Sequence, residues 1–172
     1  RVRFTYWQST TSSFPTRNTL HALQAERGTA LIMRPWRSLY LTAWVVWLID
    51  LGTKVWAVEV LSSRANVQII GSFLQLTFVQ NSGAAFGIGA GSTIIFTFFA
   101  LAVLIFITRY ALQITSKGWA LVCGLVLGGI LGNLTDRIFR EPSFLQGHVI
   151  DWIQIPNWPV FNIADTAIVI AS

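Results

Sequence analysis

Four long apolar stretches follow one another along this chain, and charged or turn-forming residues separate them. A helix needs about 20 mostly apolar residues to cross a bilayer, so residues 39–60, 92–108 and 118–131 are predicted to be membrane spans. The fourth stretch, 161–172, would cover only roughly 18 Å of a hydrocarbon core about 30 Å thick. We therefore expect a fourth span that is cut short here, with the native chain continuing beyond it.

Between the first two spans, residues 73–79 alternate partly between apolar and polar side chains and are rich in Phe, Leu, Thr and Val. This pattern predicts a short β-strand, which Asn81, Ser82 and Gly83 then break. Because non-helical backbone cannot face lipid, we place the segment in a small sheet on the outer face of the membrane. Asn81 and its neighbours form either a Gly-rich turn or a site that binds an extended peptide as an added strand.

The composition agrees with a membrane protein. Hydrophobic residues make up 53% of the chain and charged residues 11%, where soluble domains carry about 25% charged residues. The net charge is +5, but basic residues are scattered singly, which argues against a nucleic-acid partner. Arg34 and Arg37 precede the first span, and Arg109 and Lys117 lie between the second and third. By the positive-inside rule, these span ends are cytoplasmic.

No metal, cofactor or disulfide is expected. The single cysteine, Cys123, lies in an apolar run and is expected to pack as a small hydrophobe. His21 and His148 stand far apart in the sequence, and His148 is interpreted as a loop residue.

Residues 1–32 differ in character from the rest, being mixed, Ser/Thr-rich and only weakly periodic. The only methionine is Met33, and basic residues follow it directly before the first span. We expect 1–32 to be a disordered or non-native extension and 33–172 to form one membrane domain.

The predicted topology collects most of the polar residues that could be buried at the outer edge of the membrane. These residues are Asp50, Asn81, Asn133, Asp136, Arg137, Asp151, Asn162 and Asp165. Asp151 and Asp165 lie in apolar surroundings, and partial burial raises the pKa of a carboxyl group. If close together, they would share a proton, so that one activates a water while the other binds a carbonyl oxygen. Alternatively, Asp151 is a solvated loop residue and Asp165 a helix N-terminal charge favoured by the macrodipole.

The polar residues around Asn133 allow two interpretations. They form either an ordinary charged helix end, or a support in which Arg137 pairs with one carboxylate and Asn133 donates to another. Asp136 is expected to pair with Arg137 or Arg140. Asp50 and Lys54 are spaced i, i+4 and are expected to form a structural ion pair within the bundle.

Five motifs, taken in order, resemble those of bacterial lipoprotein signal peptidase, also called signal peptidase II. They are DLGTK (50–54), NSGAAFG (81–87), GNLTDR (132–137), GHVIDW (147–152) and FNIADTA (161–167). The resemblance runs from about Met33 to the end of the chain. It implies a mainly α membrane protein, a bundle of four transmembrane helices with a small extracytoplasmic β-sheet.

The resemblance also implies an aspartic endopeptidase of the bacterial cytoplasmic membrane, with its active site at the extracytoplasmic face. Such an enzyme removes the signal peptide from a prolipoprotein, cleaving before a diacylglyceryl cysteine, with contacts to membrane lipid. It needs no metal and is inhibited by globomycin. By motif position the catalytic pair is Asp151 and Asp165. The substrate-binding or supporting residues are Asn81, Gly83, Asn133, Asp136, Arg137 and Asn162, and the structural residues are Asp50 and Lys54.

The chain departs from compact family members in two places. EPSFLQ lengthens the outer loop between the third and fourth spans, which is expected to comprise residues 140–160, and the fourth span is cut short. Two other classes of function stay open. A proton-coupled transporter would use the acids as a relay, but such sites lie near the midplane between repeats, and no repeat is visible. A non-catalytic assembly protein would use polar residues only to join helices, and both aspartates would then tolerate replacement by asparagine.

Overall fold

The computed structural model describes residues 35–83 and 93–172. The predicted N-terminal extension, 1–32, and the later glycines of the NSGAAFG segment lie outside these described residues. The account below concerns the described part of the membrane domain.

Three helices are long and apolar enough to cross a membrane: α2 (Pro35–Leu61), α3 (Thr93–Tyr110) and α4 (Lys117–Phe139). A short 3-10 helix, η2 (Ala111–Gln113), connects α3 to α4, and a fourth α-helix, α5 (Ile163–Ala171), ends near the end of the chain. The protein is therefore a multi-pass, mainly helical membrane protein, as predicted. Helix α4 continues for eight residues beyond the predicted span 118–131, so Asn133, Asp136 and Arg137 lie within the helix.

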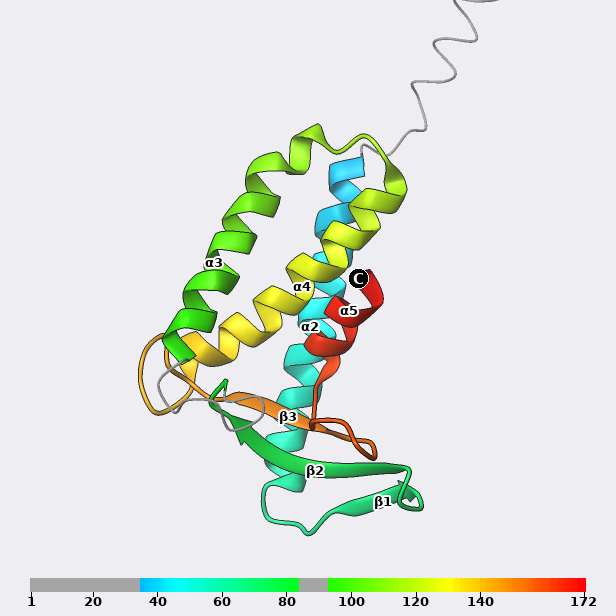
Figure 1. Cartoon of the computed structure of the whole chain (residues 1–172), viewed down its shortest axis with the longest axis vertical. Helices are drawn as coiled ribbons and strands as arrows, with labels where there is room; N and C mark the ends of the chain where they lie inside the picture. The colour runs from blue at the N-terminus through cyan, green and yellow to red at the C-terminus, as the bar shows by residue number, and fades with distance from the viewer. Residues whose placement is uncertain (1–34, 84–92) are drawn as a thin grey trace, which may run out of the picture. The chain divides into compact units, whose positions relative to one another are not determined.

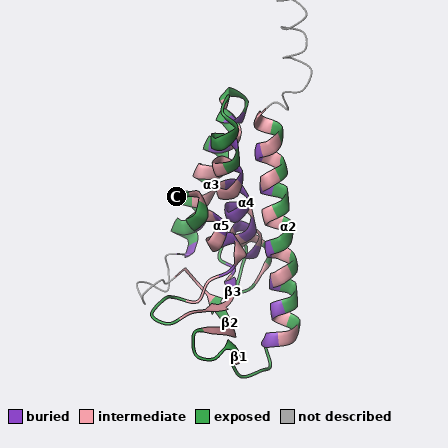
Figure 2. Ribbon diagram, turned by 90° about the vertical axis from the view of Figure 1, so that its right-hand side faces the viewer, coloured by how far each residue is buried: buried purple, intermediate pink, exposed green. Residues whose placement is uncertain are grey.

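Helix α4 lies at the centre, with α2, α3 and α5 packed around it (Figures 1 and 2). The close approach of α2 to α4 depends on glycines of α4. A Cβ on Gly124 would stand 2.7 Å from the carbonyl oxygen of Leu39, and a Cβ on Gly128 would stand 2.7 Å from Cβ of Val46. These contacts are tighter than side chains allow, so glycine is required where the two helices cross.

A three-stranded antiparallel sheet crosses one end of the helices, where α2 and α4 end and α3 and α5 begin (Figure 1). Its strands are β1 (Val67–Ile70), β2 (Leu74–Asn81) and β3 (Val149–Gln154), in that order. Strand β2 confirms the predicted strand. Residues 149–154 were expected to lie in a loop, and that expectation was wrong. They pair with β2, with Val79 opposite Asp151 and Asn81 opposite Val149.

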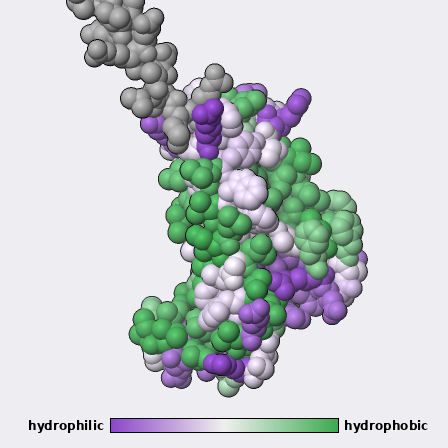
Figure 3. All heavy atoms as spheres, turned by 180° about the vertical axis from the view of Figure 1, so that it is seen from behind, coloured by the Kyte–Doolittle hydropathy of each residue, from purple (hydrophilic) through white to green (hydrophobic). Residues whose placement is uncertain are grey.

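Large apolar side chains cover the outer surface of the helices (Figure 3). Among the most exposed are Trp44, Ile95, Phe98, Phe99, Ile105 and Phe106. A water-soluble protein rarely exposes so much continuous apolar surface, whereas a bilayer solvates it. The apolar spans thus face lipid, and the polar residues are left to gather at the end that carries the sheet.

Candidate active site

Four elements meet at the sheet end of the helices and bring the predicted polar residues together. Asp151 comes from β3, Asn81 from the end of β2, Asn133 from α4, and Asp165 from the first turn of α5. Asp151 and Asp165 are 14 positions apart in the sequence. The chain turns back between β3 and the N-terminus of α5, so both residues lie at the same end of the helices. The structure brings these four residues into one hydrogen-bonded group.

The position of Asp165 follows from the local sequence Asn-Ile-Ala-Asp. Asn162 is the N-cap of α5, and its Oδ1 accepts a hydrogen bond from the backbone N–H of Asp165 at 2.9 Å. In return, Oδ2 of Asp165 accepts one from the backbone N–H of Asn162 at 3.3 Å. This capping box holds the half-buried carboxylate at a helix N-terminus, where the helix dipole favours negative charge.

Asp151 is only 1% exposed, and each of its carboxyl oxygens accepts a side-chain hydrogen bond. Nδ2 of Asn81 lies 2.9 Å from Oδ2, and Nδ2 of Asn162 lies 2.6 Å from Oδ1. The pKa of Asp151 is raised to about 7, mainly by burial and also by the nearby charge of Asp165, while the two amide donors act in the opposite direction. At neutral pH this carboxyl is therefore protonated about half of the time. The alternative of a solvated loop residue is excluded for Asp151.

Asn133 completes a chain of hydrogen bonds between the two acids. Its Oδ1 accepts from Nδ2 of Asn162 at 3.1 Å, and its Nδ2 donates to Oδ1 of Asp165 at 2.7 Å. A continuous path therefore runs from Asp151 through Asn162 and Asn133 to Asp165. The amide orientations in this path are fixed at both ends, so the two carboxyl groups are held relative to each other.

Asn81 is held in turn by Gly83. The backbone N–H of Gly83 donates to Oδ1 of Asn81 at 2.8 Å, which directs the amide nitrogen of Asn81 toward Asp151. Gly83 has φ of 91°, a conformation that glycine adopts readily and other residues avoid. The predicted Gly-rich turn after β2 thus orients a ligand of the buried carboxyl.

Arg137 and Asp136 do not pair with each other. Within the described residues Arg137 forms no ion pair; its Nη1 donates to the backbone oxygen of Asn133 at 3.2 Å. Of the two interpretations of this region, the second is met only in part, because Asn133 donates to the Asp165 carboxylate but Arg137 pairs with none. Asp136 pairs instead with Arg140 at 2.5 Å, one of its two predicted partners, and with Lys54 at 2.9 Å. Arg140 is favoured because it stands one helical turn further along α4.

The predicted ion pair between Asp50 and Lys54 is confirmed, at 2.8 Å, and both side chains are buried. Lys54 also contacts Asn133, whose Oδ1 accepts from Nζ at 2.9 Å. Sequence reasoning missed these further contacts of Lys54, because helical spacing within α2 indicates only the partner on the same helix. His148 takes no part in this network; its backbone N–H donates to the carbonyl of Glu141.

An apolar cavity of about 350 Å³ opens beside this network, between α3, α4 and α5. Its apolar lining is Phe96, Phe99, Ala100, Val103, Val126, Ile130 and Ile168, and two polar residues, Asn133 and Arg137, also line it. The cavity thus joins a lipid-like surface to the hydrogen-bonded residues around the two acids. An apolar chain in this cavity would have its polar end next to Asn133.

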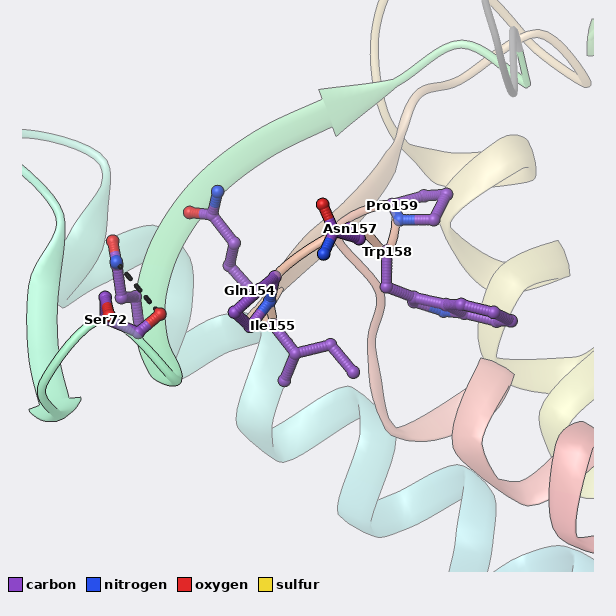
Figure 4. Close-up of a pocket in the computed structure, with 8 residues that line it drawn as sticks. Ser72, Gln154, Ile155, Asn157, Trp158 and Pro159 are labelled. Atoms are coloured by element: carbon purple, nitrogen blue, oxygen red, sulfur yellow. Dashed lines mark hydrogen bonds between the residues drawn. The ribbon is translucent and has the colours of Figure 1, made fainter.

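A larger hollow, of about 540 Å³, lies elsewhere, between the turn after β1 and the segment that follows β3. Figure 4 shows Ser72 on one side of it, facing Gln154, Ile155 and Asn157 across the gap. None of the carboxylates lines this hollow, so its size does not identify the reactive site. Within residues 35–83 and 93–172, no group of three or more His, Cys, Asp or Glu side chains is arranged to hold a metal ion.

Comparison with known proteins agrees with this architecture. A family model described as Signal peptidase (SPase) II matches residues 42–172. A lipoprotein signal peptidase of Leifsonia xyli subsp. xyli is 53% identical over 132 residues, which are 76% of this chain and 61% of that protein. One of Streptomyces griseus subsp. griseus is 47% identical over 148 residues, 86% of this chain and 74% of that protein. The chain thus spans less than two thirds of the Leifsonia protein.

A solved structure has the same fold. It is described as a bacterial membrane enzyme studied by the in meso method at 2.3 Å resolution. Its TM-score is 0.68 at 27% sequence identity, and the match covers 77% of this chain and 81% of that one. The helix bundle with its small sheet is therefore an architecture already found in a membrane enzyme.

Proposed function

Because the chain belongs to the signal peptidase II family, we propose that it is an aspartic endopeptidase that removes signal peptides from prolipoproteins. The hydrogen-bonded path from Asp151 through Asn162 and Asn133 to Asp165 carries this proposal. It holds two carboxyl groups together at the end of an apolar bundle, one of them with a pKa of about 7. Such a pair can bind one proton between two acids at neutral pH, as aspartic peptidases require.

The two acids take different roles in this mechanism. Asp165 is more exposed, lies at a helix N-terminus and acts as the base that accepts a proton from the attacking water. Asp151 is buried, carries the proton and donates it to the carbonyl oxygen of the scissile peptide bond. The resulting tetrahedral intermediate collapses when the leaving nitrogen takes the proton from Asp165 and one hydroxyl of the intermediate returns its proton to Asp151. The C–N bond then breaks, which releases a carboxylic acid and a free amine.

The substrate is a prolipoprotein, cleaved before a cysteine that carries diacylglycerol. The apolar cavity beside Asn133 fits the apolar chain of such a substrate, whose scissile carbonyl would then lie next to the two acids. Burying lipid and apolar side chains contributes roughly 0.8 kcal/mol per CH₂ group. Binding energy from these groups positions the scissile peptide bond against the two acids. The residues that support the acids or bind the substrate are Asn81, Gly83, Asn133, Asp136, Arg137 and Asn162.

The site faces the extracytoplasmic side of the bacterial cytoplasmic membrane. Arg37, Arg109 and Lys117 all lie at the helix ends remote from the sheet, where the positive-inside rule places the cytoplasm. The sheet and the two acids therefore lie on the side where exported prolipoproteins arrive. Membrane lipid and a globomycin-type inhibitor are the further partners of this site.

The test is cleavage by the purified protein in proteoliposomes, with one prolipoprotein prepared with and without the diacylglyceryl group. The proposal predicts cleavage of the lipidated form, a new amino terminus on the lipidated cysteine by mass spectrometry, and inhibition by globomycin. A site-matched substrate with serine in place of that cysteine is the control and is not cleaved. Equal cleavage of both forms would contradict the proposed substrate, and no cleavage of either would contradict the proposed activity.

A further inference from the structure

Lys54 is completely buried, and its ammonium group contacts three acceptors, one on α2 and two on α4. Nζ lies 2.8 Å from Oδ2 of Asp50, 2.9 Å from Oδ2 of Asp136 and 2.9 Å from Oδ1 of Asn133. The contacts to Asp50 and Asp136 are ion pairs, and the contact to Asn133 is a hydrogen bond donated by Nζ. The lysine therefore joins α2 to two positions on α4 with a fixed geometry.

The Asp50 contact leads to the first of the two acids. The other oxygen of Asp50, Oδ1, accepts a hydrogen bond from the backbone N–H of Ala164 at 2.9 Å. Ala164 directly precedes Asp165 in the first turn of α5. Asp50 thus fixes the backbone from which the Asp165 side chain projects.

The Asp136 contact leads to the second acid in the same way. Oδ2 of Asp136 accepts from the backbone N–H of Ile150 at 3.2 Å, and Ile150 directly precedes Asp151 in β3. The third contact, through Asn133, reaches Oδ1 of Asp165. One buried ammonium group is therefore connected to the backbone before each acid.

We propose that Lys54 is a positioning residue that sets the relative placement of Asp151 and Asp165. This inference rests on the proposed function, since it assigns Lys54 a part in the same reaction. Buried ion pairs contribute little net stability compared with apolar residues of the same volume, because desolvation offsets their attraction. The distinctive consequence of this network is geometric, because two backbone segments from different elements are held by one cation. Misplacement of a reacting group by about 1 Å can lower a rate by roughly 100-fold.

Gly132 allows this network to be disturbed without changing a charge. A Cβ at this position would overlap the Asp50 carboxylate and would approach Cβ of Ala164 to 3.0 Å. Gly132→Ala must therefore displace Asp50 or α5. Gly124 provides a matched control eight residues earlier on α4, where a Cβ would meet the Leu39 carbonyl oxygen and Thr42 of α2, far from the acids.

The experiment measures kcat, KM and the thermal midpoint for Lys54→Met, Gly132→Ala and Gly124→Ala, with rates expressed per folded molecule in proteoliposomes. We expect kcat to fall about 100-fold for Lys54→Met and Gly132→Ala, with KM nearly unchanged. Gly124→Ala lowers the thermal midpoint to a similar extent but keeps kcat within about twofold of the unmodified protein. If Lys54→Met does not fold, Gly132→Ala, which adds a single methyl group, decides.

A fall in kcat of less than about tenfold for the folded variants, relative to Gly124→Ala, would overturn the positioning role. Asp165→Asn, assayed in parallel, separates this failure from that of the proposed function. If Asp165→Asn is inactive while the Lys54 and Gly132 variants turn over normally, only the positioning role is wrong. If Asp165→Asn itself turns over normally, the proposed activity of the site fails as well.

Discussion

The side-chain nitrogen of Asn162 lies 2.6 Å from Oδ1 of Asp151, although one residue caps a helix and the other lies in the middle of a strand. The same side chain also accepts a hydrogen bond from the backbone of α5 through its oxygen. Asn162 therefore performs two separable tasks, of which one stabilises the helix and the other connects the acids.

Asn162→Ser is predicted to separate these two tasks. Serine caps helices nearly as well as asparagine, so the free energy of unfolding should change by less than about 1 kcal/mol. A hydroxyl group at this position cannot reproduce the amide donor to Asp151, so kcat should fall by roughly 10- to 100-fold. Thermal unfolding and turnover of the same preparation measure both effects. A serine variant with the kcat of the unmodified protein would show that the connection to Asp151 has no catalytic role.

The pH dependence of kcat/KM should report the protonated state of Asp151. Its pKa is about 7, and the mechanism requires its proton, so kcat/KM should decline as the pH rises through about 7. Asn81 donates a hydrogen bond that favours the charged carboxylate and so lowers this pKa. Asn81→Ala is therefore predicted to move the alkaline decline to higher pH. A decline that stays in place, or moves to lower pH, would contradict the assignment.

Stability should also depend on the proton of Asp151. Its pKa is raised in the folded state from the ordinary value of 3.8 to about 7, so the fold favours the protonated form. This contribution to the free energy of unfolding is fully present at pH below about 4 and is lost as the pH rises to about 7. About three pH units correspond to a loss on the order of 4 kcal/mol.

Asp151→Asn removes this titration, so the stability of the variant relative to the unmodified protein should increase between about pH 4 and pH 8. Denaturant unfolding in detergent at several pH values measures the difference. A difference that does not vary with pH would mean that Asp151 is ionised in the folded protein at all these pH values.

Gly83 and Gly71 both have positive φ, at 91° and 50°, but only Gly83 contacts the site. A Cβ on Gly83 would stand 3.0 Å from Cδ2 of Phe96, whereas nothing lies within 4 Å of one on Gly71. Each change to alanine should cost about 1 kcal/mol of stability through backbone strain. Only Gly83→Ala should also lower kcat, because it disturbs the Asn81 amide. Equal kcat for the two folded variants would argue against that role of Gly83.

The long helices and strand β2 were predictable because their patterns are local. Apolar runs long enough to cross a bilayer indicate spans whatever the rest of the chain does, and 73–79 has the alternation of a strand. Strand β3 was not predictable in the same way. The segment Val149–Gln154 is short and has a charged residue at its centre, and it is a strand because β2 lies beside it.

The site was predictable as a set of residues but not as a set of contacts. The order and direction of the predicted spans were enough to place the polar residues at the outer ends of the helices, because the apolar parts of the spans face lipid. The contact of Lys54 with Asn133, for example, depends on the distance between α2 and α4. That distance is set by how the two helices pack along their whole interface, which is not readable from residue types alone.

The central claim is that Asp151 and Asp165 act together on one peptide bond. The most direct measurement is single-turnover cleavage of a diacylglyceryl prolipoprotein by Asp151→Asn, Asp165→Asn and the double variant, each shown to be folded by its thermal midpoint. Each single change is predicted to lower the rate by about 1,000-fold or more, and the double change to lower it little further, because the acids act as a unit. Near-normal cleavage by either folded single variant would contradict the account.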